Sequence, residues 1–402
     1  MNFFLEIIFC VILPQIINNL VMYPRILSLD EIQDDSLFLW GARQTGKSTL
    51  LKALFPKARY YDLLNANLFR SLSRNPSLMR EQLILLPKGS VVIIDEVQKV
   101  PDLLDEVHWL IQNQGLHFIL CGSSARKLRR SGANLLGGRA LSNTLFPLVS
   151  AEIDDFDIER ALNYGTIPPH YLAKNPVRRL QAYIDDYIQQ EIVAESVLRN
   201  LSAFTRFLEV AALSDTEIVN YTNIAAECGV SAKTVKEYFS ILEETMFGFM
   251  LPAYTRTIKR RLVQSPKFYF FDVGIPNYLL ERTPLKPDTA DYGHAFEHLM
   301  VQELRAYLGY HHSRKQLSYW RTSSGIEVDC VIGDAEVAIE FKSSTEVRNA
   351  QLKGLRTLAE EHPGVKRYVV SRETYPRLVD GIEIWPIRDF LAKLWQGGII
   401  TP

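Results

Sequence analysis

The sequence has few cysteines and almost no net charge. Its four cysteines, Cys10, Cys121, Cys228 and Cys330, stand far apart in a chain of 402 residues and match neither a disulfide framework nor zinc-site spacing. We therefore expect reduced thiols and a cytoplasmic protein. The net charge of −1 excludes an overall basic field, so any contact with nucleic acid has to come from local basic patches.

Long apolar runs are also missing, apart from one at the start. Residues 3–13 are apolar except for Glu6, and this run is too short for an ordinary membrane span. A secretory signal would require basic residues at its start, but no Lys or Arg precedes Arg25. We interpret residues 1–21 as an apolar leader, either the product of an upstream start codon or a helix that packs on the body. We expect no stable membrane association. A weak interfacial anchor is the alternative, disfavoured because supporting basic residues are missing.

Residues 41–48 fit the phosphate-loop pattern, in which two glycines separated by four residues precede Lys and Ser. An apolar run precedes the loop and a helical pattern follows it. Such a loop turns backbone N–H groups toward a phosphate, while Lys47 reaches the outer phosphates and the Ser48 hydroxyl binds magnesium. A glycine turn that binds nothing is the alternative. The residues expected to bind nucleotide are Gly41, Ala42, Arg43, Gln44, Thr45, Gly46, Lys47, Ser48 and Thr49.

A second nucleotide signature follows at residues 91–96. Four β-branched residues predict a buried central strand, and Asp95 and Glu96 come at its carboxyl end, where open α/β sheets bind ligands. We expect Asp95 to hold magnesium, mostly through water, and Glu96 to orient the water that attacks the γ-phosphate. An Asp-Glu pair after a strand is common by itself. After a phosphate loop, it favours hydrolysis over binding alone.

The next apolar run, residues 117–122, predicts another strand and is followed by Ser123 and Ser124. This order of phosphate loop, apolar strand with Asp-Glu, and strand ending in a small polar residue resembles the AAA superfamily of ATPases. The resemblance implies ATP and Mg²⁺ as cofactors, a sheet with helices on both faces over residues 22–150, and a γ-phosphate sensor at Ser123 or Ser124. A helix N-cap is the alternative role for either serine.

Residues 135–139 and 146–148 resemble one bacterial and archaeal branch of these ATPases, which joins the ATPase to a C-terminal domain of unknown function. The resemblance implies that Arg139 contacts the γ-phosphate, in cis or from a neighbouring subunit of a homo-oligomer. A surface charge is the alternative. Because residues 107–151 contain no Asp or Glu, they also form a basic strip suited to phosphate or nucleic acid.

Two modules are expected between the ATPase-like domain and the last third of the chain. Residues 151–215 carry apolar residues at helical spacing and predict a helical lid or connector. Residues 216–266 show a helix, a Gly turn and a second helix, followed by an apolar stretch that could form the wing of a winged helix. DNA contact there would use Lys233 and Lys236. We prefer a packing role between domains, because acidic residues stand nearby.

A basic stretch overlaps the end of this module, since residues 245–271 contain no Asp or Glu. Its cations are interleaved with Tyr254 and Tyr269, a composition that favours a nucleic-acid backbone, although a solvated charge run fits equally well. The candidate contacts are Arg256, Lys259, Arg260 and Arg261.

The last third, residues 267–402, carries a second candidate site. Alternation puts Glu340 and Lys342 on one face of a strand, after a strand that contains Asp329 and a helix that contains Glu297. Acids and a lysine at a sheet edge suit metal-assisted phosphodiester hydrolysis. The pattern resembles the restriction-endonuclease-like nuclease core, which implies Asp329 and Glu340 as ligands for Mg²⁺ or Mn²⁺, Lys342 as catalytic lysine and Glu297 as accessory ligand. A surface ion pair is the alternative.

The sequence therefore predicts an α/β multidomain protein, with an AAA-type ATPase domain, a helical and winged-helix connector, and an α/β C-terminal domain of restriction-endonuclease-like fold. We expect ATP binding and hydrolysis that regulates or drives a DNA-directed module. Magnesium-dependent nuclease activity is a further hypothesis. Two alternatives remain: a nucleic-acid-binding switch without nuclease activity, and an ATPase that acts on protein partners and carries an inactive docking domain.

Overall fold

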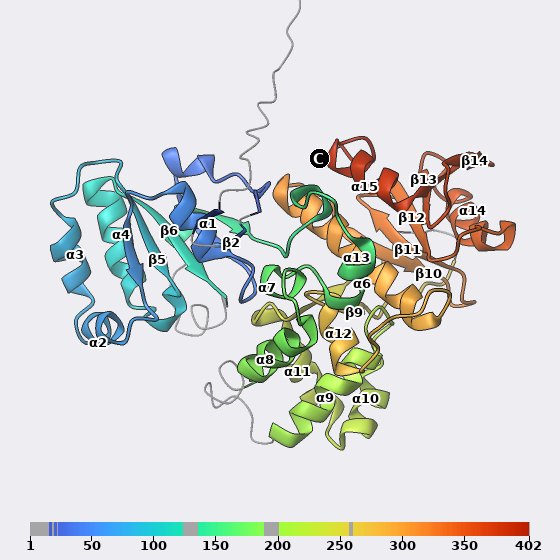
Figure 1. Cartoon of the computed structure of the whole chain (residues 1–402), viewed down its shortest axis with the longest axis horizontal. Coiled ribbons are helices and arrows are strands. Elements are labelled where there is room, and N and C mark those ends of the chain that lie inside the picture. Colours follow the sequence, from blue (N-terminus) through green and yellow to red (C-terminus); the bar gives the residue numbers. More distant parts are fainter. Residues whose placement is uncertain are drawn as a thin grey trace, which may run out of the picture.

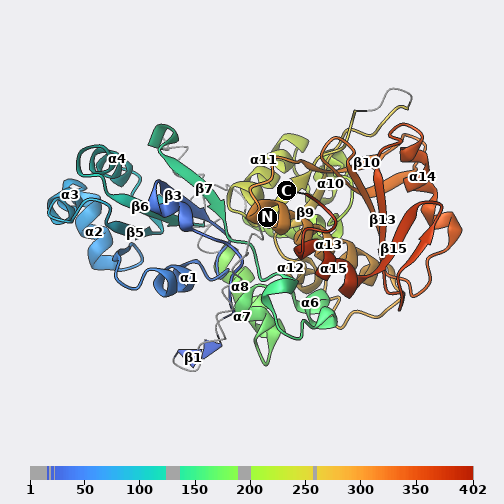
Figure 2. The ribbon, with the colours of Figure 1, turned by 90° about the horizontal axis from the view of Figure 1, so that it is seen from above.

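The computed structural model describes residues 16–17, 20–21, 23–123, 136–188, 201–256 and 260–401. Figure 1 shows three bodies: an N-terminal α/β domain, a mostly helical connector and a C-terminal α/β domain. Figure 2, turned by 90°, shows the two α/β domains at opposite ends of the molecule. The predicted α/β multidomain class is therefore confirmed.

The predicted apolar leader lies mostly outside the described residues. Within it, β1 (Ile16–Ile17) pairs antiparallel with β2 (Leu20–Val21). In the part of the chain that the structure describes, no helix combines the length and the apolar character needed to cross a membrane.

The N-terminal domain is built on a five-stranded parallel sheet of order β4-β5-β6-β3-β7. Its strands are β3 (Ser36–Trp40), β4 (Arg59–Asp62), β5 (Val91–Asp95), β6 (His117–Gly122) and β7 (Ala140–Thr144). Its helices are η1 (Asp30–Gln33), α1 (Lys47–Leu54), α2 (Ala66–Arg74), α3 (Ser77–Leu83), η2 (Val97–Lys99), α4 (Leu103–Gln114) and η3 (Leu136–Gly138).

Helices cover both faces of this sheet. On one face, Phe38 of β3 and Ile94 of β5 pack in a core with α3 and α4. On the other face, Leu39 and Ile93 pack in a core with α1. Neighbouring residues of one strand point to opposite faces, so strands that are apolar throughout can be buried on both sides. The parallel sheet with helices on both faces agrees with the prediction for this domain.

The middle of the chain is mostly helical. Its elements are η4 (Ser150–Glu152), α6 (Ile158–Tyr164), α7 (Pro168–Tyr171), α8 (Pro176–Tyr187), α9 (Leu201–Leu213), α10 (Tyr221–Cys228), α11 (Ala232–Glu244), β8 (Gly248–Leu251), β9 (Lys267–Phe270) and α12 (Gly274–Leu279). The predicted Gly turn is present between α10 and α11. Gly229 has a φ of 68° after α10, and the Ser231 side chain accepts a 3.1 Å hydrogen bond from the Thr234 amide to cap α11.

The packing divides the connector differently from the predicted boundaries. Residues of α8, α9, α10 and α11 share one hydrophobic core, so the boundary after residue 215 falls inside a packed unit. The boundary after residue 266 falls between β8 and β9, which pair antiparallel. The reason is physical: Phe268 and Phe270 of β9 complete the connector core, although the chain then continues into the C-terminal domain.

The C-terminal domain is a six-stranded mixed sheet of order β10-β11-β12-β13-β15-β14. Its strands are β10 (Leu317–Arg321), β11 (Glu327–Ile332), β12 (Val337–Lys342), β13 (Lys366–Ser371), β14 (Arg377–Val379) and β15 (Ile382–Pro386). Its helices are α13 (Ala290–Tyr310), η6 (Asn349–Leu352), α14 (Lys353–Ala359) and α15 (Ile387–Trp395). Helices α13 and α15 pack on one face of the sheet and α14 on the other. The predicted α/β sheet domain is present, while its restriction-endonuclease-like fold stays a prediction.

Candidate nucleotide site

The phosphate-loop residues lie between β3 and α1, as the sequence pattern predicts. Gly46 has a φ of 97°, a left-handed conformation that favours Gly, and it directly precedes α1. A Cβ atom on Gly41 would lie 2.6 Å from the carbonyl oxygen of Leu145, so this position also requires Gly. Gly at these two points allows the loop to pack tightly and to turn directly into α1, and the start of a helix favours an anion such as phosphate. The loop therefore fits the phosphates of ATP.

Lys47 is buried against its own loop. Its Nζ donates hydrogen bonds to the carbonyl oxygens of Gly41, at 2.7 Å, and Ala42, at 2.9 Å. Only 6% of the residue is exposed. The ammonium is therefore already held at the loop, from which it can reach the outer phosphates of a bound nucleotide.

Two oxygen ligands suited to Mg²⁺ meet at the carboxyl end of β5. The Ser48 hydroxyl donates a 2.6 Å hydrogen bond to Asp95 Oδ2, and the Tyr60 hydroxyl donates a 2.5 Å hydrogen bond to the same oxygen. Hydroxyl and carboxylate oxygens are the ligands that Mg²⁺ prefers at phosphate sites. Ser48 and Asp95 thus fit the predicted metal role. Tyr60 is a neighbour that the sequence analysis missed.

Glu96 lies beside the loop in a left-handed backbone conformation, with a φ of 60°. Burial raises the pKa of its carboxyl, an effect that the nearby Lys47 ammonium opposes. The Gln98 amide donates hydrogen bonds to Glu96 Oε2 and, at 3.3 Å, to Ser123 Oγ. One side chain therefore connects the predicted water-orienting acid with a predicted γ-phosphate sensor. The other sensor candidate, Ser124, lies outside the described residues.

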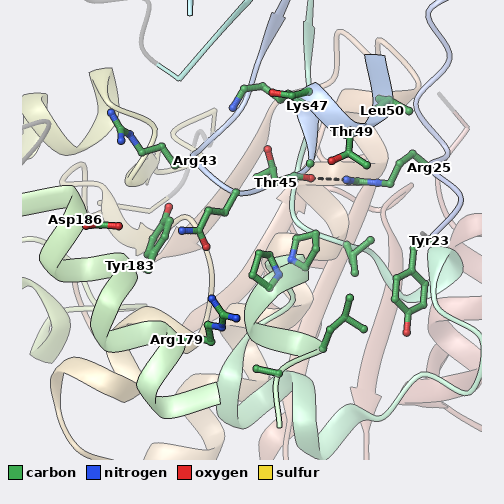
Figure 3. A pocket seen from close by; sticks show the side chains of 18 of the residues that line it. Tyr23, Arg25, Arg43, Thr45, Lys47, Thr49, Leu50, Arg179, Tyr183 and Asp186 are labelled. Atoms are coloured by element: carbon green, nitrogen blue, oxygen red, sulfur yellow. Dashed lines mark hydrogen bonds between the residues drawn. The ribbon is translucent and has the colours of Figure 1, made fainter. Parts of the chain in front are cut away.

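A cavity of about 790 Å³ opens beside the loop. Figure 3 shows Arg179 and Tyr183 of α8 across this cavity from Thr45 and Lys47 of the loop. Phosphate-loop residues 43–49 form one wall, and the connector helices form the opposite wall. Apolar side chains that line the cavity include Tyr23, Leu148, Pro168, Pro169 and Leu172. The cavity thus lies between the N-terminal domain and the connector, and its size suits a nucleotide.

Arg25 joins the loop to distant parts of the chain. Its guanidinium donates hydrogen bonds to the Thr45 carbonyl oxygen at 2.7 Å, Glu152 Oε2 at 3.0 Å and the Tyr310 hydroxyl at 3.0 Å. It also donates to the carbonyl oxygen of Phe146 at 2.6 Å. Only 6% of the Arg25 side chain is exposed, and the Glu152 side chain is fully buried.

Comparison with known proteins agrees with this geometry. Residues 33–154 match the family model described as AAA domain. This part of the chain is therefore similar to AAA-type ATPase domains. Residues 155–286 match a domain of unknown function (DUF8612), and residues 292–390 match another (DUF4143).

The chain is also similar to other proteins over most of its length. Two uncharacterised proteins, from Mycobacterium tuberculosis and Mycobacterium bovis, are each 24% identical over 352 residues, which cover 83% of this chain and 78% of the relative. The structure of the Aeropyrum pernix ORC1 protein in complex with DNA is 13% identical, covers 61% of this chain and 86% of that chain, and has a TM-score of 0.27. A score of this size carries no inference about function.

Arg139 does not line the cavity of the ATPase domain. It is exposed after η3, and its Nη1 lies 3.4 Å from the Leu136 carbonyl oxygen. A contact of Arg139 with γ-phosphate, in cis or from a neighbouring subunit, stays a prediction. The other cations of the predicted basic strip lie outside the described residues.

The predicted C-terminal residues do come together. Lys342 Nζ lies 2.6 Å from Glu340 Oε1 and 3.9 Å from Asp329 Oδ2. Burial raises the pKa of Glu340 to about 8 and that of Asp329 to about 6, and the mutual repulsion of the two carboxyls adds to the shift of Glu340. Only 9% of the Glu340 side chain is exposed, whereas Lys342 is partly exposed at 24%, so the pair has one buried and one half-buried partner. Within the described ranges, no group of three or more His, Cys, Asp or Glu side chains is arranged to hold a metal ion.

Glu297, predicted as an accessory metal ligand, has other partners here. Its Oε1 accepts hydrogen bonds from Lys267 Nζ at 2.9 Å and from the Tyr269 hydroxyl at 2.7 Å. Lys267 also lies 2.7 Å from Glu327 Oε1. We call Glu297, Glu327, Asp329 and Glu340 the carboxylate cluster.

The proposed nucleic-acid contacts differ in their surroundings. Arg256 lies 3.3 Å from Asp334, and Arg260 pairs with Glu360 and Glu361, so neighbouring acids neutralise much of the predicted basic stretch. Lys236 lies over the ring of Tyr221, at 5.1 Å. Three further candidates remain: Lys233 and Arg261 are exposed, and Lys259 lies outside the described residues.

The two tyrosines of the predicted basic stretch, residues 245–271, cannot serve as a stacking platform for bases. Tyr269 is 0% exposed and Tyr254 is 6% exposed. Tyr269 stacks on Phe249 inside the domain core, and the Tyr254 hydroxyl donates a 3.0 Å hydrogen bond to Asp334. The interpretation of their spacing as a nucleic-acid surface was wrong, because both rings are used for packing.

Proposed function

We propose that this protein binds and hydrolyses ATP in its AAA domain and transmits the nucleotide state to its C-terminal domain. The observation that carries the proposal is the position of Arg25. One buried guanidinium contacts the phosphate loop at Thr45, the start of the connector at Glu152 and the C-terminal domain at Tyr310. A change in the loop on nucleotide binding therefore acts directly on both other bodies.

The residues around the cavity would have different roles in hydrolysis. Lys47 and the loop amides hold the phosphates, and Glu96 orients the attacking water and accepts its proton. Ser48 and Asp95 would hold Mg²⁺, which neutralises charge that develops on the phosphate oxygens when it is bound. Arg179 on α8 is a cation on the connector wall of the cavity, so it is placed to bring the connector toward phosphate.

Transmission depends on tight packing around Arg25. The Tyr310 hydroxyl also accepts a 3.2 Å hydrogen bond from the Phe146 amide, and the Phe146 ring packs edge-on against Tyr310 at 5.5 Å. Packed interfaces of this kind shift between discrete arrangements rather than deforming smoothly. Movement of the loop would thus be passed on instead of being absorbed by solvent.

The ATPase assignment is tested with Lys47→Ala. We expect ATP turnover to fall at least about a hundredfold, because the contact to the outer phosphates is lost. Lys57→Ala, an exposed lysine just beyond α1, is the matched control and should leave turnover unchanged. Wild-type turnover in Lys47→Ala would show that the site is wrong. Transmission is tested by hydrogen exchange of α13, which should change on ATP addition in the wild type and not in Lys47→Ala.

A second candidate function is metal-dependent cleavage of nucleic acid by the C-terminal domain. The convergence of Asp329, Glu340 and Lys342 favours it. Single- and double-stranded DNA and RNA should be incubated with the protein, with and without ATP and Mn²⁺. Cleavage that persists in an Asp329→Ala, Lys342→Ala double variant would exclude this site. Binding without cleavage would favour a switch, and no salt-sensitive binding would favour protein partners.

A further inference from the structure

Lys267 enters the carboxylate cluster from a different body of the protein. It is the first residue of β9, which pairs with β8 of the connector. Its Nζ nevertheless lies 2.9 Å from Glu297 Oε1 on α13 and 2.7 Å from Glu327 Oε1 on β11. Only 4% of the side chain is exposed, and the ring of Tyr319 on β10 lies 5.5 Å from the ammonium. The connector thus inserts one cation into the C-terminal domain.

The charges of the cluster explain why a cation is held there. Four buried or partly buried carboxylates face three cations, namely Lys267, Lys342 and Arg321, whose Nη1 lies 2.8 Å from Glu327 Oε2. Buried carboxylates are costly unless they are paired. Without the Lys267 ammonium, two cations would face four carboxylates. With all four carboxyls ionised, a single divalent cation would neutralise the two carboxylate charges left unpaired.

One oxygen of the cluster is available for such an ion. Glu340 is 7% exposed, and among the described residues its Oε2 has no hydrogen-bond partner. Its other oxygen, Oε1, bonds Lys342 at 2.6 Å. A buried carboxylate oxygen without a donor is a ready ligand for a hard cation such as Mg²⁺ or Mn²⁺.

We propose that Lys267 is an internal cation that keeps divalent metal out of the carboxylate cluster by occupying oxygens of Glu297 and Glu327. The ammonium and the metal compete for the same oxygens of Glu297 and Glu327. Competition between Lys267 and metal does not depend on nuclease activity. Its functional consequence does rest on the second candidate function, because the cluster with bound metal is the form that could cleave a phosphodiester.

The first test measures Mn²⁺ binding to the full chain without nucleotide. Lys267→Met should bind one Mn²⁺ at least tenfold more tightly than the wild type, and Lys267→Arg, which keeps the charge, should not. Adding Asp329→Asn to Lys267→Met should remove the gained site. Equal Mn²⁺ affinity of wild type and folded Lys267→Met, or a gained site that survives Asp329→Asn, would overturn the proposal. Circular dichroism establishes that each variant is folded.

The second test needs no variant, because Lys267→Met leaves carboxylates unpaired and can unfold the domain. Amine-specific labelling of the wild type is followed peptide by peptide. Lys267 should be protected without metal and become several-fold more reactive in millimolar Mn²⁺, while the exposed Lys366 serves as internal reference. Mn²⁺ that binds in an Asp329-dependent way and leaves Lys267 protected would contradict competition. Neither test uses ATP turnover, so failure here is separate from failure of Lys47→Ala.

Discussion

Arg25 donates a 2.7 Å hydrogen bond to the carbonyl oxygen of Thr45, in the middle of the phosphate loop. The same guanidinium forms a buried ion pair with Glu152, which in turn accepts a 2.8 Å hydrogen bond from the Ile26 amide. The segment before the sheet, the nucleotide loop and the start of the connector are therefore held by one cation.

Arg25→Met should lower the free energy of unfolding by about 3 to 5 kcal/mol, because Glu152 would stay buried without its partner. Chemical denaturation measures the change. Arg80→Met is the control, since Arg80 pairs with Glu106 at 2.8 Å but is 36% exposed, and it should cost less than about 1 kcal/mol. Equal effects of the two variants would mean that the Arg25 pair is not a buried anchor. Adding Glu152→Gln to Arg25→Met should recover part of the loss.

Glu96→Gln should retain ATP binding and slow hydrolysis by about 10² to 10⁴-fold, the usual contribution of a general base. Its amide preserves the size of the side chain but cannot accept a proton. Nucleotide binding is measured by calorimetry and turnover by phosphate release. Glu81→Gln, on the exposed side of α3, should match the wild type in both. A Glu96→Gln protein with normal turnover would show that another group activates the water.

Glu303 should make stability depend on pH. Its buried carboxylate accepts hydrogen bonds from the Ser150 amide at 2.7 Å and from Trp395 Nε1 at 2.7 Å, yet burial raises its pKa from 4.5 to about 7. A carboxyl with a raised pKa binds more protons in the folded state. Stability from this group therefore falls as pH rises from about 4.5 to about 7 and levels off above.

The variant Glu303→Gln isolates this effect from other buried acids. The loss of unfolding free energy between pH 5 and pH 8 should be about 2 to 3 kcal/mol smaller in the variant. Denaturant titrations at the two pH values measure it. An unchanged pH dependence would mean that Glu303 is ionised in the folded protein at pH 5. Glu383→Gln, a carboxyl on β15 that pairs with Lys393 at 3.3 Å and is 40% exposed, is the control.

Gly165→Ala should destabilise the protein by more than about 3 kcal/mol. Gly165 has a φ of 75°, and a Cβ atom there would lie 1.5 Å from Oδ1 of the buried Asp272. Gly229→Ala is the matched control, because Gly229 also has a positive φ, 68°, but no atom would lie within 4 Å of its Cβ. It should cost only about 1 kcal/mol. Thermal unfolding of both variants compares them, and similar losses would show that the clash with Asp272 is relieved.

Features that depend on neighbouring residues could be predicted from the sequence. The loop of residues 41–48, the acids at the carboxyl end of β5 and the shared face of Glu340 and Lys342 all follow from spacings of a few residues. The turn between α10 and α11 also follows from its local residues. Such short patterns are enough to predict which side chains lie on the same face, because the periods of helices and strands are fixed.

Features made by distant residues could not be predicted in this way. Arg25 and Tyr310 are separated by 285 positions, and no sequence period links them. Lys267 lies in the basic stretch of residues 245–271, but its partners are acids on two other elements. Composition showed cations and aromatic rings, and could not distinguish a solvent-facing surface from side chains that point inward.

Helix α13 runs without interruption from Ala290 to Tyr310. Tyr310, at its end, touches Arg25 beside the nucleotide loop, and Glu297, about 20 Å earlier along the helix axis at 1.5 Å per residue, holds Lys267. A regular helix of this length behaves as a stiff rod. The surroundings of the phosphate loop and the carboxylate cluster are therefore joined by one rigid helix. If nucleotide binding tilts α13 at Tyr310, as we propose, Glu297 would move with it, with no unfolding between them.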